Sequence, residues 1–372
     1  MVMLPAQAAS DPTLDAISAA VQNVNNLQKP RAYLGMSAIG MDCEAFLWRN
    51  FRWCGPSGGG FDAKSLMNFE DGHRTEDLMA ARLRMVPGVE LYTVDPSTGE
   101  QFGFKDLGGH FCGHIDGAIR GILQAPKAWH MWENKASEKG PAELAKLKEK
   151  HGEKNALKQW NGTYHAQAIL YMHYGAMERH YLTCTSPGGR MPITSVRTNA
   201  DDAEAERLKA KAERVIFSPE PLAKISDDPA FWKCKGCAMN AQCHTTALPA
   251  VSCRTCLHAT PEKDGDGRWS CAKYWADIPL DAQRKGCDGH LYIPALLKRW
   301  GEATDASADE GWVEYTAADG FVFRNGPRGA GSFESKELAA ASPAEIRDEE
   351  LNKVRLAFAG RFVETTDLGV AA

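Results

Sequence analysis

The chain has 372 residues, more than one compact core commonly holds, so we expect a main domain with one or two smaller modules. Its hydrophobic fraction of 44% and charged fraction of 24% are those of an ordinary globular protein and leave the function open. The net charge of −5 excludes a general electrostatic attraction to nucleic acid, so any such binding must depend on a local basic surface.

Apolar residues are distributed too evenly for a membrane-spanning protein. No run of about 18 apolar residues occurs, so we expect no transmembrane helix and no membrane partner. The opening residues Met1–Pro5 lack the basic segment of a signal peptide, which predicts a cytoplasmic protein with reduced thiols. Seven of the 11 cysteines fall between Cys234 and Cys287, and in a reducing compartment this clustering indicates metal binding rather than disulfides.

Helical patterns and a glycine-rich loop make up the first 85 residues. Apolar residues recur at helical spacing, and Ser37 is a suitable N-cap. The predicted helices cover residues 11–27, the segment from Ser37 through Leu47, and residues 68–85, with a loop at 55–60 before the last.

Strand patterns dominate the next part of the chain, and helices then return. The predicted strands are at 90–94, 103–107, 111–119, 129–136, 181–184 and 193–197. The predicted helices are at 141–151, 158–174 and 203–216.

Three domains are expected along the chain: a main domain over 1–250, a cysteine-rich module over 251–295, and a tail over 296–372. The middle stretch is rich in Cys, His, Asp and Gly and could not build a core without a crosslink. In the tail, a hairpin is predicted over 311–325 around Asp319-Gly320, followed by a helix over 343–363.

Asp116, Glu133 and Lys135 are candidates for a metal-dependent hydrolytic site. In a strand, Glu133 and Lys135 project to the same face, and Asp116 ends a preceding strand that could meet them across the sheet. Two carboxylates and the main-chain carbonyl of Asn134 are oxygen ligands suited to Mg²⁺ or Mn²⁺. Lys135 would position or deprotonate the attacking water, and acting as a base would require the site to lower its pKa.

Together with His73 upstream and Gln167 and Tyr171 downstream, this set resembles the PD-(D/E)XK nuclease superfamily, specifically its RecB-like branch, over roughly residues 33–245. The resemblance implies an α/β, restriction-endonuclease-like fold with a mixed central sheet flanked by helices. It implies a metal-dependent DNA exonuclease of recombination, repair or phage DNA processing, acting on single-stranded DNA or duplex ends, with a recombination or replication protein as a further partner. His73 would bind the catalytic metal, while Gln167 and Tyr171 would support substrate or the active centre.

Two other functions stay open: a non-catalytic DNA-binding or assembly module with the nuclease fold, and a redox protein. A run of lysines from Lys135 to Lys158 could track a DNA backbone or form an ordinary solvated helix face. Trp160 and Tyr164 could stack on unpaired bases or be half-buried packing residues.

A cysteine triplet, Cys234, Cys237 and Cys243, looks like the C-terminal triplet of iron–sulfur nucleases such as the CRISPR-associated RecB-type exonuclease and AddB. The resemblance implies that Cys43 completes the set around a structural [4Fe–4S] cluster. A zinc site made by the same thiols, or by the triplet with His244, is the competing account. Cys54 could also replace Cys43.

A second set of cysteines follows at Cys253, Cys256, Cys271 and Cys287. A close pair followed by single ligands suggests a structural zinc knuckle, with His258 and His290 as alternative ligands and free thiols as the other reading. Phage-borne exonucleases of the branch are loosely similar in carrying such an appendage. Cys112 and Cys184 are expected to be buried apolar residues.

Overall fold

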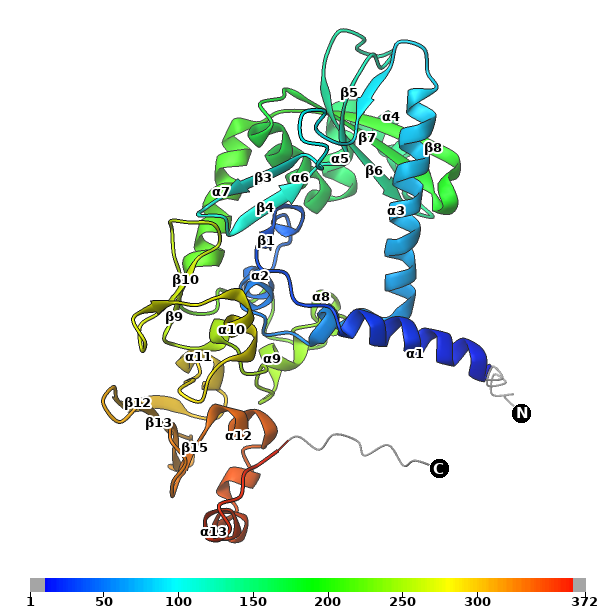
Figure 1. Cartoon of the computed structure of the whole chain (residues 1–372). Helices are drawn as coiled ribbons and strands as arrows, with labels where there is room; N and C mark the ends of the chain where they lie inside the picture. The colour runs from blue at the N-terminus through cyan, green and yellow to red at the C-terminus, as the bar shows by residue number, and fades with distance from the viewer. Residues whose placement is uncertain (1–10, 364–372) are drawn as a thin grey trace, which may run out of the picture.

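The computed structural model of the chain describes residues 11–363 (Figure 1). Met1–Pro5, the segment lacking signal-peptide features, lies outside the described residues. Within the described part, every helix is too short or too polar to cross a membrane.

A five-stranded mixed sheet forms the centre of the upper part of the molecule (Figure 1). Its order is β2-β5-β6-β7-β8, in which β6 and β7 run parallel and the other neighbours antiparallel. The predicted mixed α/β architecture is therefore confirmed. The strands are β2 (Glu90–Tyr92), β5 (Gly117–Arg120), β6 (His130–Ala136), β7 (Arg179–Ser186) and β8 (Arg190–Asn199).

Helices cover both faces of this sheet because its central strands are apolar on both sides. Trp132 of β6 packs with Ala80 and Leu83 of the long helix α3 on one face. On the other face, Leu182 of β7 packs against α4, α5 and α6. The helices are α3 (Ala63–Arg84), α4 (Gly140–His151), α5 (Glu153–Trp160) and α6 (Gly162–Tyr174).

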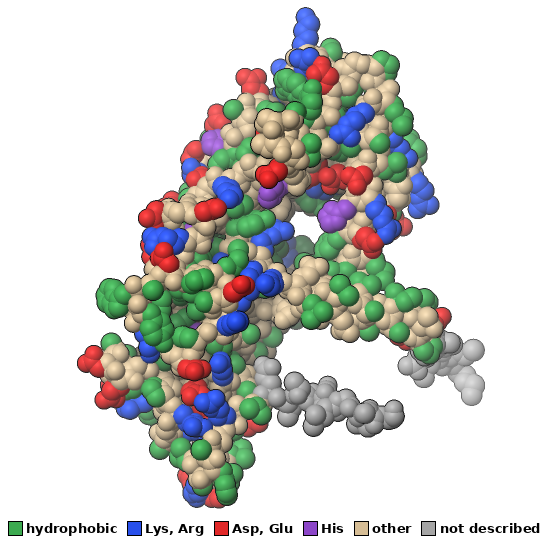
Figure 2. All heavy atoms as spheres, viewed as in Figure 1, with side chains coloured by type: hydrophobic (Ala, Val, Ile, Leu, Met, Phe, Trp, Pro, Cys, Tyr) green, Lys and Arg blue, Asp and Glu red, His purple; other side chains and the backbone are tan. Residues whose placement is uncertain are grey.

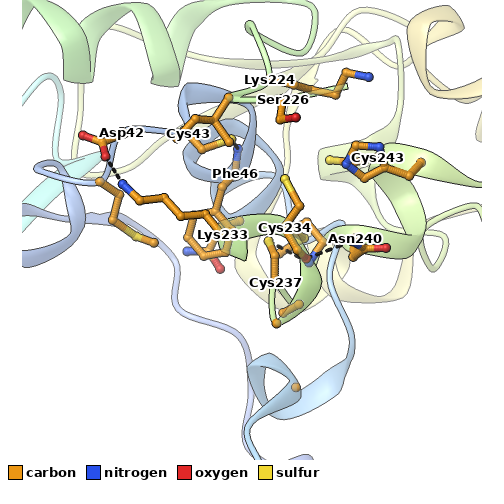
Figure 3. A pocket seen from close by; sticks show the side chains of 18 of the residues that line it. Asp42, Cys43, Phe46, Lys224, Ser226, Lys233, Cys234, Cys237, Asn240 and Cys243 are labelled. Carbon is orange, nitrogen blue, oxygen red and sulfur yellow. Dashed lines mark hydrogen bonds and ion pairs between the residues drawn. The ribbon is translucent and has the colours of Figure 1, made fainter. Parts of the chain in front are cut away.

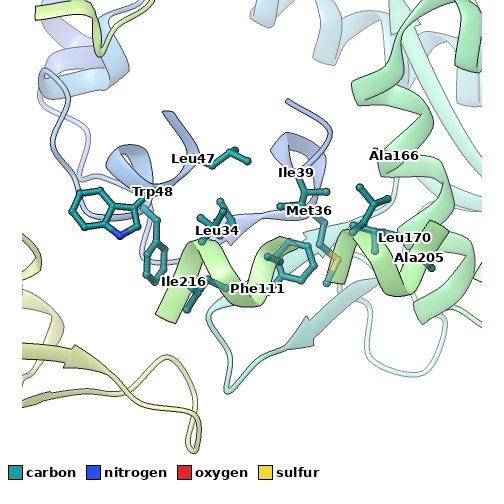
Figure 4. Close-up of a cluster of buried hydrophobic side chains, with 14 of the residues drawn as sticks. Leu34, Met36, Ile39, Leu47, Trp48, Phe111, Ala166, Leu170, Ala205 and Ile216 are labelled. Atoms are coloured by element: carbon teal, nitrogen blue, oxygen red, sulfur yellow. The ribbon is translucent and has the colours of Figure 1, made fainter. Parts of the chain in front are cut away.

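The largest core joins the N-terminal segment to helices from the middle of the chain (Figure 4). Leu34, Met36 and Trp48 are almost fully buried there, among side chains of α6 and α7 and next to Phe111 of a small second sheet. That sheet has the order β1-β4-β3. The elements are α1 (Pro12–Asn26), β1 (Leu34–Gly35), α2 (Glu44–Phe51), β3 (Gly103–Asp106), β4 (Phe111–His114) and α7 (Asp202–Phe217).

The helix predicted from Ser37 is wrong in its start. A short 3-10 turn, Met36–Ala38, ends there, and α2 begins only after Cys43, whose Sγ accepts a hydrogen bond from the backbone N–H of Phe46 at 3.4 Å. The chain instead passes close to α6 at Gly40, where a Cβ would lie 2.5 Å from Cα of Thr163. This tertiary approach overrides the local helical pattern.

Two further elements are shorter than predicted. The strand over 111–119 is interrupted between β4 and β5, so Asp116 lies in the break. The helix over 158–174 is divided at Asn161, whose side chain caps α6 by accepting from the backbone N–H groups of Thr163 and Tyr164 at 2.9 and 3.1 Å. The apolar spacing used to predict the helix runs on through Asn161, and this spacing gives no sign that Asn161 caps a new helix.

The cysteine-rich stretch packs onto the main body. Cys256, Ala259 and Trp269 belong to the same core as Trp48. Buried side chains on both sides of residue 250 thus share one core. The domain boundary at 250 stays a prediction. Its elements are α8 (Trp232–Lys235), α9 (Asn240–His244), β9 (Ala259–Pro261), β10 (Trp269–Cys271), β11 (Ala276–Asp277), α10 (Leu280–Lys285) and α11 (Pro294–Leu297).

The C-terminal part builds its own core around Tyr315, Phe323 and Phe333. Strands β13 and β14 pair antiparallel around Asp319 and Gly320, where the sequence predicts the hairpin. The elements are β12 (Glu302–Ser307), β13 (Trp312–Thr316), β14 (Val322–Asn325), β15 (Ser332–Phe333), α12 (Ser335–Ala340) and α13 (Glu349–Ala357).

Candidate functional site

The break between β4 and β5 brings Asp116 to the middle of β6. Because Gly117 pairs with Trp132 in the antiparallel register, the preceding residue reaches the next part of β6. The Oδ2 atom of Asp116 accepts a hydrogen bond from the backbone N–H of Asn134 at 2.8 Å. The predicted approach of Asp116 to the Glu133–Lys135 segment is thus seen in the structure.

Glu133 is deeply buried, with 3% of its surface exposed. Its Oε1 atom accepts from Nε2 of Gln167 at 2.9 Å and forms an ion pair with Nζ of Lys135. Its Oε2 atom is buried and has no hydrogen-bond partner among residues 11–363. A buried carboxylate oxygen without a partner is costly, so this atom marks a place for a cation or a donor.

Gln167 and Tyr171 lie one helical turn apart on α6 and face the same site. The side chain of Gln167 hydrogen-bonds Tyr171 as well as Glu133. Gly113 leaves room for this tyrosine, because a Cβ there would lie 2.6 Å from Cε1 of Tyr171. Burial, followed by the charge of Glu133, raises the pKa of Tyr171, so its hydroxyl stays protonated and available as a donor.

Helix α3 adds two residues to the site from the other side. His73 is exposed and lies close enough to Asp116 for its charge to influence that carboxylate. Glu76, one turn further, interacts electrostatically with Asp116 and Lys135. The sequence places Glu76 beside His73 without giving it a site role; its i+3 position on the same helix face is the signal that identifies it.

Three carboxyl groups therefore face one lysine, and burial together with their mutual repulsion raises their pKa values. Burial, then the charge of Asp116, raises the pKa of Glu133 from 4.5 to about 8. The same two causes raise the pKa of Glu76 from 4.5 to about 7. Burial also raises the pKa of Asp116. The site carries more negative charge than Lys135 compensates.

Lys135 keeps its proton in this environment. Burial alone would lower the pKa of Lys135, but the charges of Glu133 and Asp116 outweigh that effect and raise it. The ring of Tyr164 lies 5.2 Å from Nζ of Lys135 and adds a cation–π contact. Without a bound cation, Lys135 therefore carries an ammonium group.

The side chain of Asn134 points away from the acids. Its Oδ1 atom accepts from Oγ1 of Thr183 at 2.9 Å, and the same hydroxyl accepts from Nε1 of Trp132 at 3.1 Å. Asn134 contributes to the site through its backbone N–H, which donates a hydrogen bond to Asp116. Thr183, which fixes this face of β6, is a positioning residue that no sequence pattern indicated.

The residues proposed to stack on bases are engaged within the protein. Trp160 is half-buried, its Nε1 donates to Glu143 at 3.1 Å, and its ring lies 5.6 Å from that of half-buried Tyr164. Lys148 pairs with Glu153 and donates to the carbonyl of Ser195. Packing roles therefore account for these side chains.

A cavity of about 590 Å³ is lined by all four cysteines of the first set (Figure 3). Cys43 comes from the start of α2, Cys234 and Cys237 from α8 and the turn after it, and Cys243 from α9. The Sγ of Cys237 accepts from the backbone N–H of Met239 at 3.4 Å. His244 also lines the cavity, whereas Cys54 is buried outside its lining.

A second cavity, of about 260 Å³, is lined by the second set: Cys253, Cys256, Cys271 and Cys287, together with His258 and His290. Cys112 and Cys184 lie in neither lining and are buried, as expected.

No three or more His, Cys, Asp or Glu side chains in the described part of the chain are already arranged as a metal-binding group. At the acid site the reason is visible: Glu133 is turned to Lys135 and Gln167, and Asp116 to the backbone of Asn134. The orphaned Oε2 atom and the excess of carboxylates nevertheless fit a divalent cation.

No protein-family model matches the chain, and no curated protein sequence does. Among solved structures, SSO0001 aligns with a TM-score of 0.34 and 12% identity, covering 62% of this chain and 96% of that one. An alkaline exonuclease from Laribacter hongkongensis, LHK-Exo, aligns with a TM-score of 0.33 and 15% identity over 54% of this chain and 90% of its own. Its complex with dAMP aligns with a TM-score of 0.34 and 14% identity over 50% and 86%. Likenesses of this size do not establish a family, so the function is inferred from the chain's own residues.

Proposed function

We propose that the chain is a divalent-metal-dependent deoxyribonuclease of the PD-(D/E)XK type, related to the RecB-like branch and acting as an exonuclease in recombination, repair or phage DNA processing. The observation that carries the proposal is the meeting of Asp116, Glu133, Lys135 and Gln167 around one buried, unpartnered carboxylate oxygen. These residues come from three separate parts of the chain, and Glu76 of α3 brings a third acid to Lys135; a structural ion pair alone would not need three acids.

Asp116, Glu133 and Glu76, with His73 at the exposed side, would hold Mg²⁺ or Mn²⁺. Such an ion, when bound, supplies charge neutralisation and orientation for a phosphodiester. The remaining work falls to the chain's own residues. Gln167 holds the Glu133 carboxylate in place, and the ammonium group of Lys135 can orient an attacking water or a phosphate oxygen.

DNA could reach this site from the side of α3. Figure 2 shows an opening between the body of the molecule and the segment formed by α1 and α3, with charged side chains and histidines around its visible rim. Helix α3 carries the exposed His73, so the acid site faces accessible surface. The exposed lysines of α4 and α5 offer further contacts to phosphates: Lys146, Lys150 and Lys158.

The test is digestion of end-labelled single-stranded and duplex DNA, with open or blocked ends, by the purified chain in Mg²⁺, Mn²⁺ or chelator. We expect metal-dependent release of nucleotides from open ends, lost in Glu133→Gln. Glu138→Gln, an exposed carboxylate just beyond β6, is the matched control and should digest normally. DNA binding without cleavage in any metal would instead assign a non-catalytic binding module.

The first cysteine cavity fits a [4Fe–4S] cluster as a structural cofactor of this nuclease. Its four thiols come from both ends of the main domain, and backbone N–H groups already point at Cys43 and Cys237. A cluster held there would join α2 to α8 and α9. Its support is the shared cavity together with the resemblance of the triplet.

Anaerobic purification with visible spectroscopy and iron and sulfide analysis tests this cofactor. We expect a broad absorption band in the blue part of the visible spectrum, together with iron and labile sulfide. The band, the iron and the sulfide should all be lost in Cys234→Ser. Cys184→Ser, a buried cysteine outside both cavities, should keep them. Zinc without iron in this set would refute the cluster.

A further inference from the structure

Three arginines are buried between the two cysteine cavities without any acidic partner. Arg49, Arg52 and Arg254 have 8%, 2% and 0% of their surfaces exposed. No Asp or Glu among residues 11–363 forms an ion pair with any of them. A guanidinium group is strongly basic and costly to bury unpaired, so this layer of positive charge needs an explanation.

Arg254 is enclosed by aromatic rings and neutral acceptors. Its guanidinium carbon lies 3.9 Å from the ring centroid of Trp53 and 4.7 Å from that of Trp269. It donates to the carbonyls of Phe51 and Ala32 at 3.0 and 2.8 Å and to the side chain of Gln283 at 3.1 Å. Each of its three nitrogens donates one hydrogen bond to a neutral acceptor, and none donates to a carboxylate among the described residues.

Arg52 lies beside Arg254 and interacts electrostatically with Cys256 of the second set. It donates to the carbonyls of Arg254 and Ser218, and its Nε is buried without a partner within the described residues. Burial lowers the pKa of Arg52 to about 10, while the charges of Cys54 and Cys256 oppose that shift. Thiols are therefore the ionisable groups that face this arginine.

The second cavity collects four thiols from separate segments. Cys253 and Cys256 flank Arg254 in the chain, while Cys271 ends β10 and Cys287 follows α10. All four cysteines line this one cavity of about 260 Å³, although their side chains are not yet turned into a metal-binding arrangement. His290 also lines the cavity, but its Nε2 is already hydrogen-bonded to Thr255 at 3.1 Å.

We propose that Cys253, Cys256, Cys271 and Cys287 bind one Zn²⁺ ion as a tetrathiolate, and that the buried guanidinium groups of Arg52 and Arg254 balance its charge. Four thiolates on a divalent zinc leave two negative charges, which equal the two positive charges of Arg52, whose electrostatic partners include Cys256, and of Arg254, which stands between Cys253 and Cys256 in the chain. The arginines would then be the outer-shell partners of the metal site. This inference does not depend on nuclease activity.

Metal analysis of the full-length chain tests the site. We expect the wild-type protein to hold one zinc that Cys271→Ser/Cys287→Ser loses and that the control Cys184→Ser retains. Cys234→Ser/Cys237→Ser should retain this zinc, which separates the second set from the first. Unchanged zinc in Cys271→Ser/Cys287→Ser, or iron in place of zinc, overturns the proposal.

Zinc affinity tests the role of the arginines, measured by competition with a chromogenic chelator. Arg254→Met should bind zinc at least about tenfold more weakly than wild type, as expected for loss of an outer-shell partner. Arg268→Met, which removes a cation paired with Asp264 and Asp277 in the same module, is the control and should bind normally. If Arg254→Met does not fold, Arg52→Met carries the same comparison; equal affinity in the arginine variant and the control overturns the charge-balance role.

Discussion

The acid site and the group of buried arginines both have an excess of one charge, negative at the acid site and positive at the arginines. At the acid site, Glu76, Asp116 and Glu133 outnumber Lys135, whereas Arg52 and Arg254 pair with no Asp or Glu among residues 11–363. The acid site opens to solvent through the exposed α3 residues, while the arginines are sealed. Under the two proposals, the first region would hold a cation that exchanges during turnover, and the second a permanently bound anionic centre.

The largest expected effect is the separation of activity from stability at the acid site. Asp116→Asn should lower DNA cleavage at least about a thousandfold, because several kcal/mol of charge stabilisation depend on this carboxylate. The same change should raise the Tm of the metal-free protein, since it removes repulsion from Glu133 and Glu76. Calorimetry in chelator, beside the cleavage assay, measures both. A lower Tm would show that Asp116 has a structural role instead.

Removal of charge from the other region should act in the opposite direction. Arg254→Met should destabilise the metal-loaded protein by about 3 kcal/mol, the cost of breaking a buried charge interaction and its hydrogen bonds. Arg268→Met, which removes a surface ion pair in the same module, should cost much less. Urea unfolding of both variants gives the comparison, and equal losses would contradict it.

A smaller effect is expected for the residue that only orients Glu133. Gln167→Ala removes the 2.9 Å hydrogen bond to Oε1 and should lower cleavage about ten- to a hundredfold, typical for an outer-shell partner of a metal ligand. Because the carboxylate itself remains, higher Mg²⁺ or Mn²⁺ concentrations should restore part of the rate. Gln159→Ala, an exposed residue of α5, is the control and should cleave normally. A metal-independent loss would place Gln167 in substrate contact.

The sequence predicted the acid site better than the arginine layer, for a physical reason. Spacing along one strand already places Glu133 and Lys135 on one face, and Gln167 and Tyr171 on one helix face. The role of Glu76 depends on how α3 crosses the sheet, which periodicity does not specify. The sequence did not predict the buried arginines. Nothing in the local pattern distinguishes Arg254 from an exposed charged residue, because Trp53 and Trp269 enclose it only in the folded chain. The early start predicted for the second helix failed similarly, since the close approach of Gly40 to Thr163 is a tertiary contact.

The pH dependence of stability offers the finest comparison between the two regions. Between about pH 7.5 and 9, a buried histidine such as His180, whose pKa burial lowers from 6.5 to about 3, is almost entirely neutral in both the folded and the unfolded chain. Arginines do not titrate in this range. Glu133, by contrast, has an unfolded pKa near 4.5 and a folded pKa raised to about 8, so the folded state binds the extra proton. Since stability falls with pH wherever the folded state binds more protons, the metal-free protein should lose stability as pH rises through this window.

Thermal unfolding in chelator across this range measures that slope. Glu133→Gln, which cannot ionise, should reduce it to the smaller slope that Glu76 contributes through its own raised pKa, while Arg254→Met should leave it unchanged. Mg²⁺ should raise the Tm more at about pH 9 than at about pH 7.5, because the cation binds the ionised acids that destabilise the metal-free fold. A wild-type slope that persists in Glu133→Gln would mean that the buried negative charge lies elsewhere. That result would contradict the proposal that the acids around Glu133 form an exchangeable cation site.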